Sequence, residues 1–264
     1  MAFKRAPNLF GCRAKIGWAQ HHLDTLKAHV EAFLEGHRYV VIAESDAERG
    51  CYVARLKNPP PIPATEWALM IGDCVHNART ALDFLAWELA GADPDDRETY
   101  FPICLTRESY RSTGERRVAT LPEQARTLIE QMQPYHAADP AKHDLWALQQ
   151  LDIADKHKLL TVTAVVAEAG QLSFRIPGGI DASRFRWAAF PDVALEHDAI
   201  LGELHVGSPL PEMTVELELA PGVAFGEAHG WGRRVFVISS LQTIVDDVEA
   251  IGFLFKQRFD LRDS

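Results

Sequence analysis

The sequence predicts an α+β fold: a bundle of long helices around residues 65–90, with a mostly antiparallel sheet formed by residues 162–220. Two patterns lead to this prediction. Apolar residues recur with the roughly 3.6-residue period of a helix over most of the first 160 residues and again from residue 234. Between these stretches, apolar and polar residues alternate, as they do in strands with one face in water. We expect one domain over residues 1–264, with a helical part (1–160 and 234–264) and a sheet part (161–220).

Composition narrows the classes of function. Hydrophobic residues make up 47% of the chain and charged residues 24%, which is typical of globular proteins. The formal net charge of −10 argues against broad DNA binding, which needs a basic surface. No run resembles a signal peptide or a membrane span, so we expect a soluble, cytoplasmic protein with no membrane partner. The four cysteines form no CxxC pair, and we expect no zinc or other metal, no disulfide and no cofactor.

The first 63 residues predict a helix, a hairpin and a stiff connector. A helical period runs from about residue 10 to residue 35 and ends at Gly36. Residues 38–44 and 50–58 are rich in Tyr, Val and Ile and predict two strands joined by a polar turn. This hairpin is a candidate to join the later sheet. The proline-rich run 59–63 leads into the central helix.

The central helix, predicted over residues 65–89, has two contrasting sides. One side is apolar and consists of Trp67, Met70, Ile71, Cys74, Ala78, Leu82, Leu85 and Leu89. The opposite side carries His76, Arg79, Asp83 and Trp87, with Gly72, Asp73 and Thr80 beside them. A tryptophan is a poor choice for open water, and a glycine costs roughly 1 kcal/mol in a helix interior. We therefore expect a second element to cover this polar side.

Beyond the central helix the sequence predicts loops, two further helices and then strands. Residues 100–103 form an apolar plug, and the basic segment 107–117, which lacks periodicity, is the best candidate for a mobile flap. Helices are expected over residues 121–132 and 142–161. Five strands precede a closing helix at about residues 234–259, and they span residues 161–168, 171–176, 185–190, 203–206 and 214–219.

The helix predicted over residues 142–161 places a carboxylate among apolar positions. Asp155 falls in the middle of its apolar side. An ionised carboxylate buried without a partner is strongly unfavourable, so Asp155 should meet a cation. The central helix offers Arg79 and His76, and we predict a bidentate ion pair between Asp155 and Arg79.

Two short strings hold the candidate site, because P-loop, Rossmann, GxSxG and HExxH motifs are absent. Residues 76–83 read His-Asn-Ala-Arg-Thr-Ala-Leu-Asp, and residues 155–158 read Asp-Lys-His-Lys. An imidazole beside a guanidinium and carboxylates can act as a general acid or base. The catalytic candidates are His76, Arg79, Asp83, Asp155 and His157, and the ligand-binding candidates are Asp73, Asn77 and Trp87. The alternative is a buried polar cluster that only fixes the register of the helices.

These strings resemble a family of uncharacterised bacterial and phage proteins. Its members carry a helix reading roughly His/Asn-x-x-Arg-Ser/Thr-x-Leu-Asp-His/Phe and a later Asp-Lys-His-Arg/Lys. The similarity covers residues 67–89 and 148–160, and the remainder only in layout. Where the family helix ends in His, its Arg-x4-His pattern is similar to the motif of HEPN ribonucleases, all-helical RNA-cutting domains of defence and toxin systems. Arg79 matches this pattern but Phe84 stands where the histidine would be, so the resemblance implies a degenerate site.

Three functions follow from these observations. The first is a HEPN-like defence protein associated with RNA. The second is a small-molecule binding or hydrolytic protein that uses a pocket at His76, Arg79 and Asp155. The third is a structural or interaction protein that forms a homodimer through one of its long helices. Arg79 at a symmetric interface would favour the first function. An open pocket beside Arg79 would favour the second function, and a closed polar cluster would favour the third.

Overall fold

The computed structural model describes residues 7–91, 98–168, 172–175, 185–190, 193–207, 214–217, 220–226 and 236–262. It confirms the predicted α+β class. The chain divides into two compact units, a helical unit of residues 1–27, 65–161 and 227–264 and a strand unit of residues 28–64 and 162–226. Folding as one cooperative domain stays a prediction, because compactness alone does not measure cooperativity.

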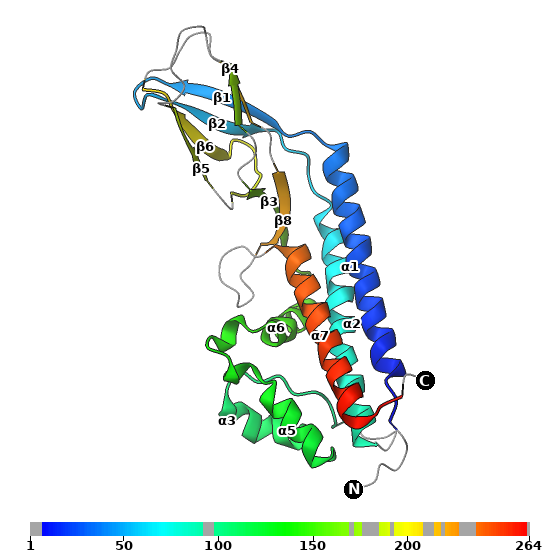
Figure 1. Cartoon of the computed structure of the whole chain (residues 1–264). Helices are drawn as coiled ribbons and strands as arrows, with labels where there is room; N and C mark the ends of the chain where they lie inside the picture. The colour runs from blue at the N-terminus through cyan, green and yellow to red at the C-terminus, as the bar shows by residue number, and fades with distance from the viewer. Residues whose placement is uncertain are drawn as a thin grey trace. The chain divides into compact units, whose positions relative to one another are not determined.

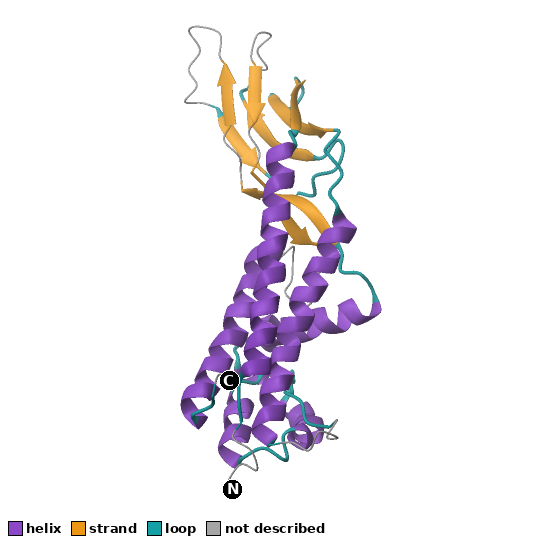
Figure 2. Cartoon of the chain, turned by 90° about the vertical axis from the view of Figure 1, so that its right-hand side faces the viewer, coloured by secondary structure: helices purple, strands orange, loops and turns teal. Residues whose placement is uncertain are grey.

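Three long helices supply most of the helical unit: α1 (Phe10–Gly36, whose last turns belong to the strand unit), α2 (Ala64–Ala90) and α7 (Val237–Phe259). They run side by side (Figures 1 and 2). The apolar side predicted for the central helix is the side that packs, so the periodicity identified the core correctly. Its fully buried side chains include Trp67, Ile71, Leu82, Leu85 and Leu89. None of the described helices is both long and apolar enough to cross a membrane.

Shorter helices follow α2. They are α3 (Arg107–Ser109), the π-helical turn η1 (Tyr110–Gly114), α4 (Glu115–Arg117), α5 (Glu123–Gln131), the 3-10 turns η2 (Pro134–His136) and η3 (Pro140–Lys142), and α6 (Asp144–His157). The segment predicted as an irregular, mobile flap is therefore helical, which corrects the sequence interpretation. The ring of Tyr110 explains the turn, because it is buried at the place where a side chain on Gly114 would stand, with Cδ2 only 2.7 Å from an added Cβ.

The strand unit contains a four-stranded sheet and two two-stranded ribbons, and all the pairings between its described strands are antiparallel. The sheet has the order β1 (Val40–Asp46), β2 (Cys51–Lys57), β6 (Ile200–His205) and β5 (Arg186–Ala189). One ribbon pairs β3 (Val162–Glu168) with β8 (Ala220–Phe225), and the other pairs β4 (Leu172–Arg175) with β7 (Thr214–Leu217). The amino-terminal hairpin does join the later strands, through β2 and β6. Strand β8 was not predicted.

The side chains of the four-stranded sheet alternate between two faces, because successive residues of a strand point in opposite directions. Tyr52 and Leu204 pack together on one face. Cys51 lies opposite His205 in the register of β2 and β6, and Glu203 comes two residues before His205. These three chemistry-bearing residues therefore share the other face.

All four cysteines are free and buried. Burial raises the pKa of the Cys12 thiol on α1 and of the Cys74 thiol on α2 to about 12. Both thiols therefore stay protonated at neutral pH and behave as small apolar groups.

The turn between β1 and β2 requires a glycine at position 50, which gives a stability prediction. Gly50 has a φ of +63°, and a Cβ there would lie 2.5 Å from the backbone oxygen of Gly207. Gly207 has a φ of +82°, but nothing lies within 4 Å of its added Cβ. We expect Gly50→Ala to lower the free energy of unfolding by about 2–3 kcal/mol, and Gly207→Ala by only about 1 kcal/mol. Denaturant unfolding measures both, and equal losses would contradict the clash.

Candidate functional site

Helix α6 covers the polar side of α2, which confirms that a second element lies there. Three pairs join the two helices in antiparallel order: Gly72 with Asp155, His76 with Asp152, and Arg79 with Gln149. Gly72 is where the helices come closest, because a Cβ on it would lie 2.3 Å from Oδ1 of Asp155. The glycine that is unfavourable for an isolated helix is thus required by the packing of α6.

Arg79 lies inside this interface, and each nitrogen of its guanidinium group donates a hydrogen bond. Nε donates to Oε1 of Gln149 at 2.9 Å, and Nη1 donates to Oδ1 of Asp83 at 2.7 Å. Nη2 donates to the backbone oxygen of Phe101 at 2.8 Å. The residue is only 7% exposed. A guanidinium in this position fixes the packing of three segments and is closed to a ligand.

Asp83 and Arg79 together hold the backbone of the apolar plug (residues 100–103) at Phe101. Oδ1 of Asp83 accepts a hydrogen bond from the backbone N–H of Phe101 at 3.0 Å, while Arg79 holds the oxygen of the same residue. Gln133 repeats the arrangement nearby, accepting from the N–H of Cys104 at 2.9 Å and donating to the oxygen of Pro102 at 2.8 Å. Burial raises the pKa of Asp83, although the charge of Arg79 and the two hydrogen bonds oppose the shift.

The predicted ion pair between Arg79 and Asp155 is wrong. Asp155 lies against Gly72, which is two turns of α2 away from Arg79, so it is beyond the reach of the guanidinium. Arg79 finds its carboxylate within its own helix, at Asp83. Helical periodicity identified the side of each helix correctly, but it did not give the position along the axis at which the two helices meet.

The solvent edge of the same interface carries His76, whose side chain is 54% exposed. Its Nδ1 lies 3.4 Å from Oδ1 of Asp152, a carboxylate that is only 3% exposed and also accepts a hydrogen bond from Lys156 at 2.5 Å. Nε2 lies 3.5 Å from Oγ1 of Thr80. A carboxylate behind Nδ1 leaves Nε2 as the proton acceptor, so this pair can act as a weak general base. Both contacts are long for hydrogen bonds.

Asp155 stands beside this edge with acidic neighbours. Burial raises its pKa, and the charges of Asp152 and Asp73 add to the shift, while His76 and Lys156 oppose it. Of the predicted site residues, the structure thus places His76 and Asp155 at this edge, whereas Oδ2 of Asp73 lies 3.9 Å from Nδ1 of His22 on α1.

The other predicted site residues are placed elsewhere. Asn77 is buried and faces α1, where its Oδ1 accepts a hydrogen bond from Lys15 at 2.9 Å. His157 is exposed at the last turn of α6, and Trp87 is half-buried two turns of α2 beyond Arg79. The sequence motif therefore separates into an exposed edge at His76 and a sealed cluster at Arg79.

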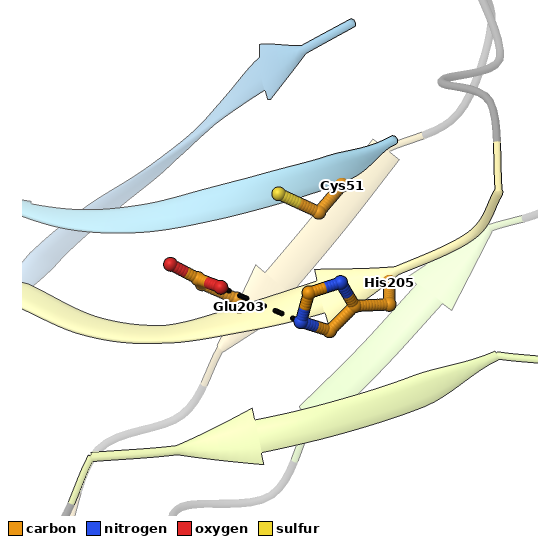
Figure 3. Close-up of side chains that lie close together, drawn as sticks. All are labelled: Cys51, Glu203 and His205. Atoms are coloured by element: carbon orange, nitrogen blue, oxygen red, sulfur yellow. Dashed lines mark ion pairs between the residues drawn. The ribbon is translucent and has the colours of Figure 1, made fainter. Parts of the chain in front are cut away.

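The strand unit holds a second group of side chains that the sequence interpretation missed. The ligand-type atoms of Cys51, Glu203 and His205 all lie within 4.8 Å of one another (Figure 3). Glu203 and His205 are two residues apart on one strand, a spacing that places both on the same face. That spacing was the available local signal, whereas the partner Cys51 becomes visible only through strand pairing.

Comparison of the chain with protein-family models, with characterised proteins and with solved structures finds no match.

The sealed cluster gives a stability prediction. Asp83→Ala removes the acceptor for both the Arg79 guanidinium and the Phe101 N–H, and should lower the free energy of unfolding by roughly 3 kcal/mol. Asp73→Ala is the matched control on the same helix, because its side chain is 64% exposed, and should change the value by less than about 0.5 kcal/mol. Similar losses in urea unfolding would show that the contacts of Asp83 with Arg79 and Phe101 are not stabilising.

At the exposed edge, we predict a substitution that raises the free energy of unfolding instead of lowering it. Because the pKa of Asp155 is raised in the folded protein, its ionisation opposes folding above the folded pKa, and this penalty disappears as the pH falls toward its ordinary value of 3.8. Asp155→Asn should therefore increase the free energy of unfolding at pH 7, and the gain should shrink steadily on acidification. A gain that does not vary with pH, or a loss at pH 7, would contradict this assignment.

Proposed function

We propose that this chain is an interaction protein whose helical unit self-associates through the groove between α1 and α7. The observation that carries the proposal is a self-complementary stripe on α7. It fits the third of the functions suggested by the sequence, because the polar cluster at Arg79 is closed and its donors are engaged.

The groove lies between two long helices and is partly apolar. Its volume is about 430 Å³, and its lining includes Cys12, Ile16 and Gly17 from α1 and Val245, Gly252 and Phe253 from α7. The ring of Phe253 is 58% exposed, which is unusual for a large aromatic side chain on a helix that buries its other side. Aromatic side chains, Phe included, are enriched in the cores of protein interfaces.

Charges of opposite sign flank this ring. Glu249, Phe253 and Lys256 stand at positions i, i+4 and i+7 of α7 and therefore form one stripe. If two copies of α7 pack antiparallel about Phe253, Glu249 of each copy faces Lys256 of the other. The two rings then meet at the symmetry axis. A stripe that is complementary to itself in this way is the requirement for a two-fold homodimer.

The other two functions receive less support. A ribonuclease site built on Arg79 needs that guanidinium to reach a phosphate, whereas the residue is buried and bonded to Asp83 and Phe101. A hydrolytic site built on the sequence motif of α2 would have to rest on the pair of His76 and Asp152, whose separation of 3.4 Å is longer than a good hydrogen bond.

Charge reversal tests the dimer directly. Sedimentation velocity of the full chain should show a dimer, and Glu249→Lys or Lys256→Glu alone should weaken association at least tenfold by placing like charges opposite each other. The double variant restores opposite charges and should dimerise again. The two single variants, when mixed, should form a heterodimer for the same reason.

Two further variants test whether the loss of the dimer is specific to the α7 stripe or follows from any new charge on an exposed apolar position. Phe253→Glu should abolish the dimer, whereas Leu69→Glu, which alters a 54% exposed apolar residue of α2 outside the groove, should not. A wild-type monomer at every accessible concentration would overturn the proposal. So would a double variant that associates no better than the single ones.

A further inference from the structure

The cluster of Cys51, Glu203 and His205 is built by strand pairing in the strand unit. Cys51 lies directly opposite His205 across the β2–β6 pair. Glu203, two residues before His205 on β6, lies on the same face of the sheet (Figure 3). The Cys51 side chain is fully buried, Glu203 is 8% exposed and His205 is 42% exposed. One side of the cluster is therefore closed by protein, and the imidazole side is open to solvent.

The separations in the cluster are close to those between ligands of one ion. A tetrahedral zinc ion holds its sulfur, nitrogen and oxygen ligands roughly 3.3–3.8 Å apart, as follows from metal–ligand bonds of about 2.0–2.3 Å. Nε2 of His205 and Oε2 of Glu203 are already 3.4 Å apart. The Cys51 sulfur lies within 4.8 Å of both, so a small rotamer adjustment would bring it into range.

Arg49 holds the carboxylate in the orientation that a metal ligand needs. Its Nη2 lies 2.7 Å from Oε1 of Glu203, which leaves Oε2 directed at His205. Partners of this kind orient ligating groups and are commonly important for affinity. Arg49 also balances charge, because the thiolate formed on binding, the carboxylate and the guanidinium together carry one negative charge opposite the ion.

We propose that Cys51, Glu203 and His205 form a binding site for a divalent transition-metal ion of the zinc class. The thiolate and imidazole ligands favour such an ion over calcium or magnesium, which prefer oxygen ligands. With three protein ligands, the ion keeps a coordination position for water or another small ligand on the side of the exposed imidazole. The proposal departs from the expectation, drawn from cysteine spacing, that the chain binds no metal.

Binding is coupled to proton release. An ordinary cysteine thiol has a pKa of about 8.5 and therefore carries its proton at neutral pH. When the metal–sulfur bond forms, the S–H bond breaks and the proton leaves to solvent. The apparent affinity should therefore rise with pH, and titration calorimetry in buffers of different ionisation enthalpy should detect the released proton.

Cobalt titration of the full chain, purified after treatment with a chelator, tests the site. We expect one equivalent of Co²⁺ to bind and to produce the near-ultraviolet charge-transfer absorption of a cobalt–thiolate bond, which zinc then displaces. Cys51→Ser should remove this absorption, and Glu203→Gln and His205→Ala should each weaken binding at least tenfold. Circular dichroism checks that each variant is folded.

Matched controls lie outside the cluster. Cys104→Ser alters another buried thiol, and His197→Ala alters another exposed imidazole of the strand unit, and both should keep the absorption and the affinity. Absence of the thiolate absorption in the wild type, or its persistence in Cys51→Ser, would overturn the proposal. The result is independent of the dimer, because Glu249, Phe253 and Lys256 belong to the helical unit.

Discussion

The buried guanidinium of Arg79 is the interaction on which the helical unit depends. It bonds to its own helix at Asp83, to α6 at Gln149 and to the backbone of the apolar plug at Phe101. A charge removed from water is tolerated only when its hydrogen-bond capacity is used, so these contacts must form together. The packing of α6 and the position of the plug are therefore linked through one side chain. This linkage explains a polar motif in the middle of a core helix without requiring a reaction.

Periodicity was sufficient to predict the longer helices and the buried side of α2, but not the contacts between the helices. Gly72 correctly indicated that a second element lies on α2, and Asp155 correctly indicated a carboxylate in that interface. The partner of Arg79 was missed because Asp83, four residues away, satisfies it locally. The backbone oxygen of Phe101 is also a partner of Arg79, and a backbone acceptor cannot be recognised from the type of residue that carries it. The helical turn at Tyr110 was missed because the local contact of its ring with Gly114, four residues later, produces no apolar period.

The strand unit shows a different limit of sequence analysis. Cysteine spacing is informative for metal sites whose ligands lie on one loop, and it fails when β pairing supplies the ligands. Cys51 meets Glu203 and His205 only after β2 and β6 align in one register. A shift of that register by one residue would turn the cysteine to the opposite face. Gly50 and Gly207 help to hold the register, because the backbone oxygen of Gly50 accepts hydrogen bonds from Val206 and Gly207 at 3.1 Å.

The buried free cysteines can serve as internal probes of local unfolding in each unit. Cys12, Cys74 and Cys104 belong to the helical unit, whereas Cys51 belongs to the strand unit. A thiol that is protonated and shielded reacts with a disulfide reagent only during the moments when its surroundings open. The rate at which Cys51 is modified therefore measures the opening of one unit, and the rates of the other three measure the opening of the other. After division by the rate for a free thiol, the logarithm of the ratio of these rates gives the difference between the opening free energies of the two units.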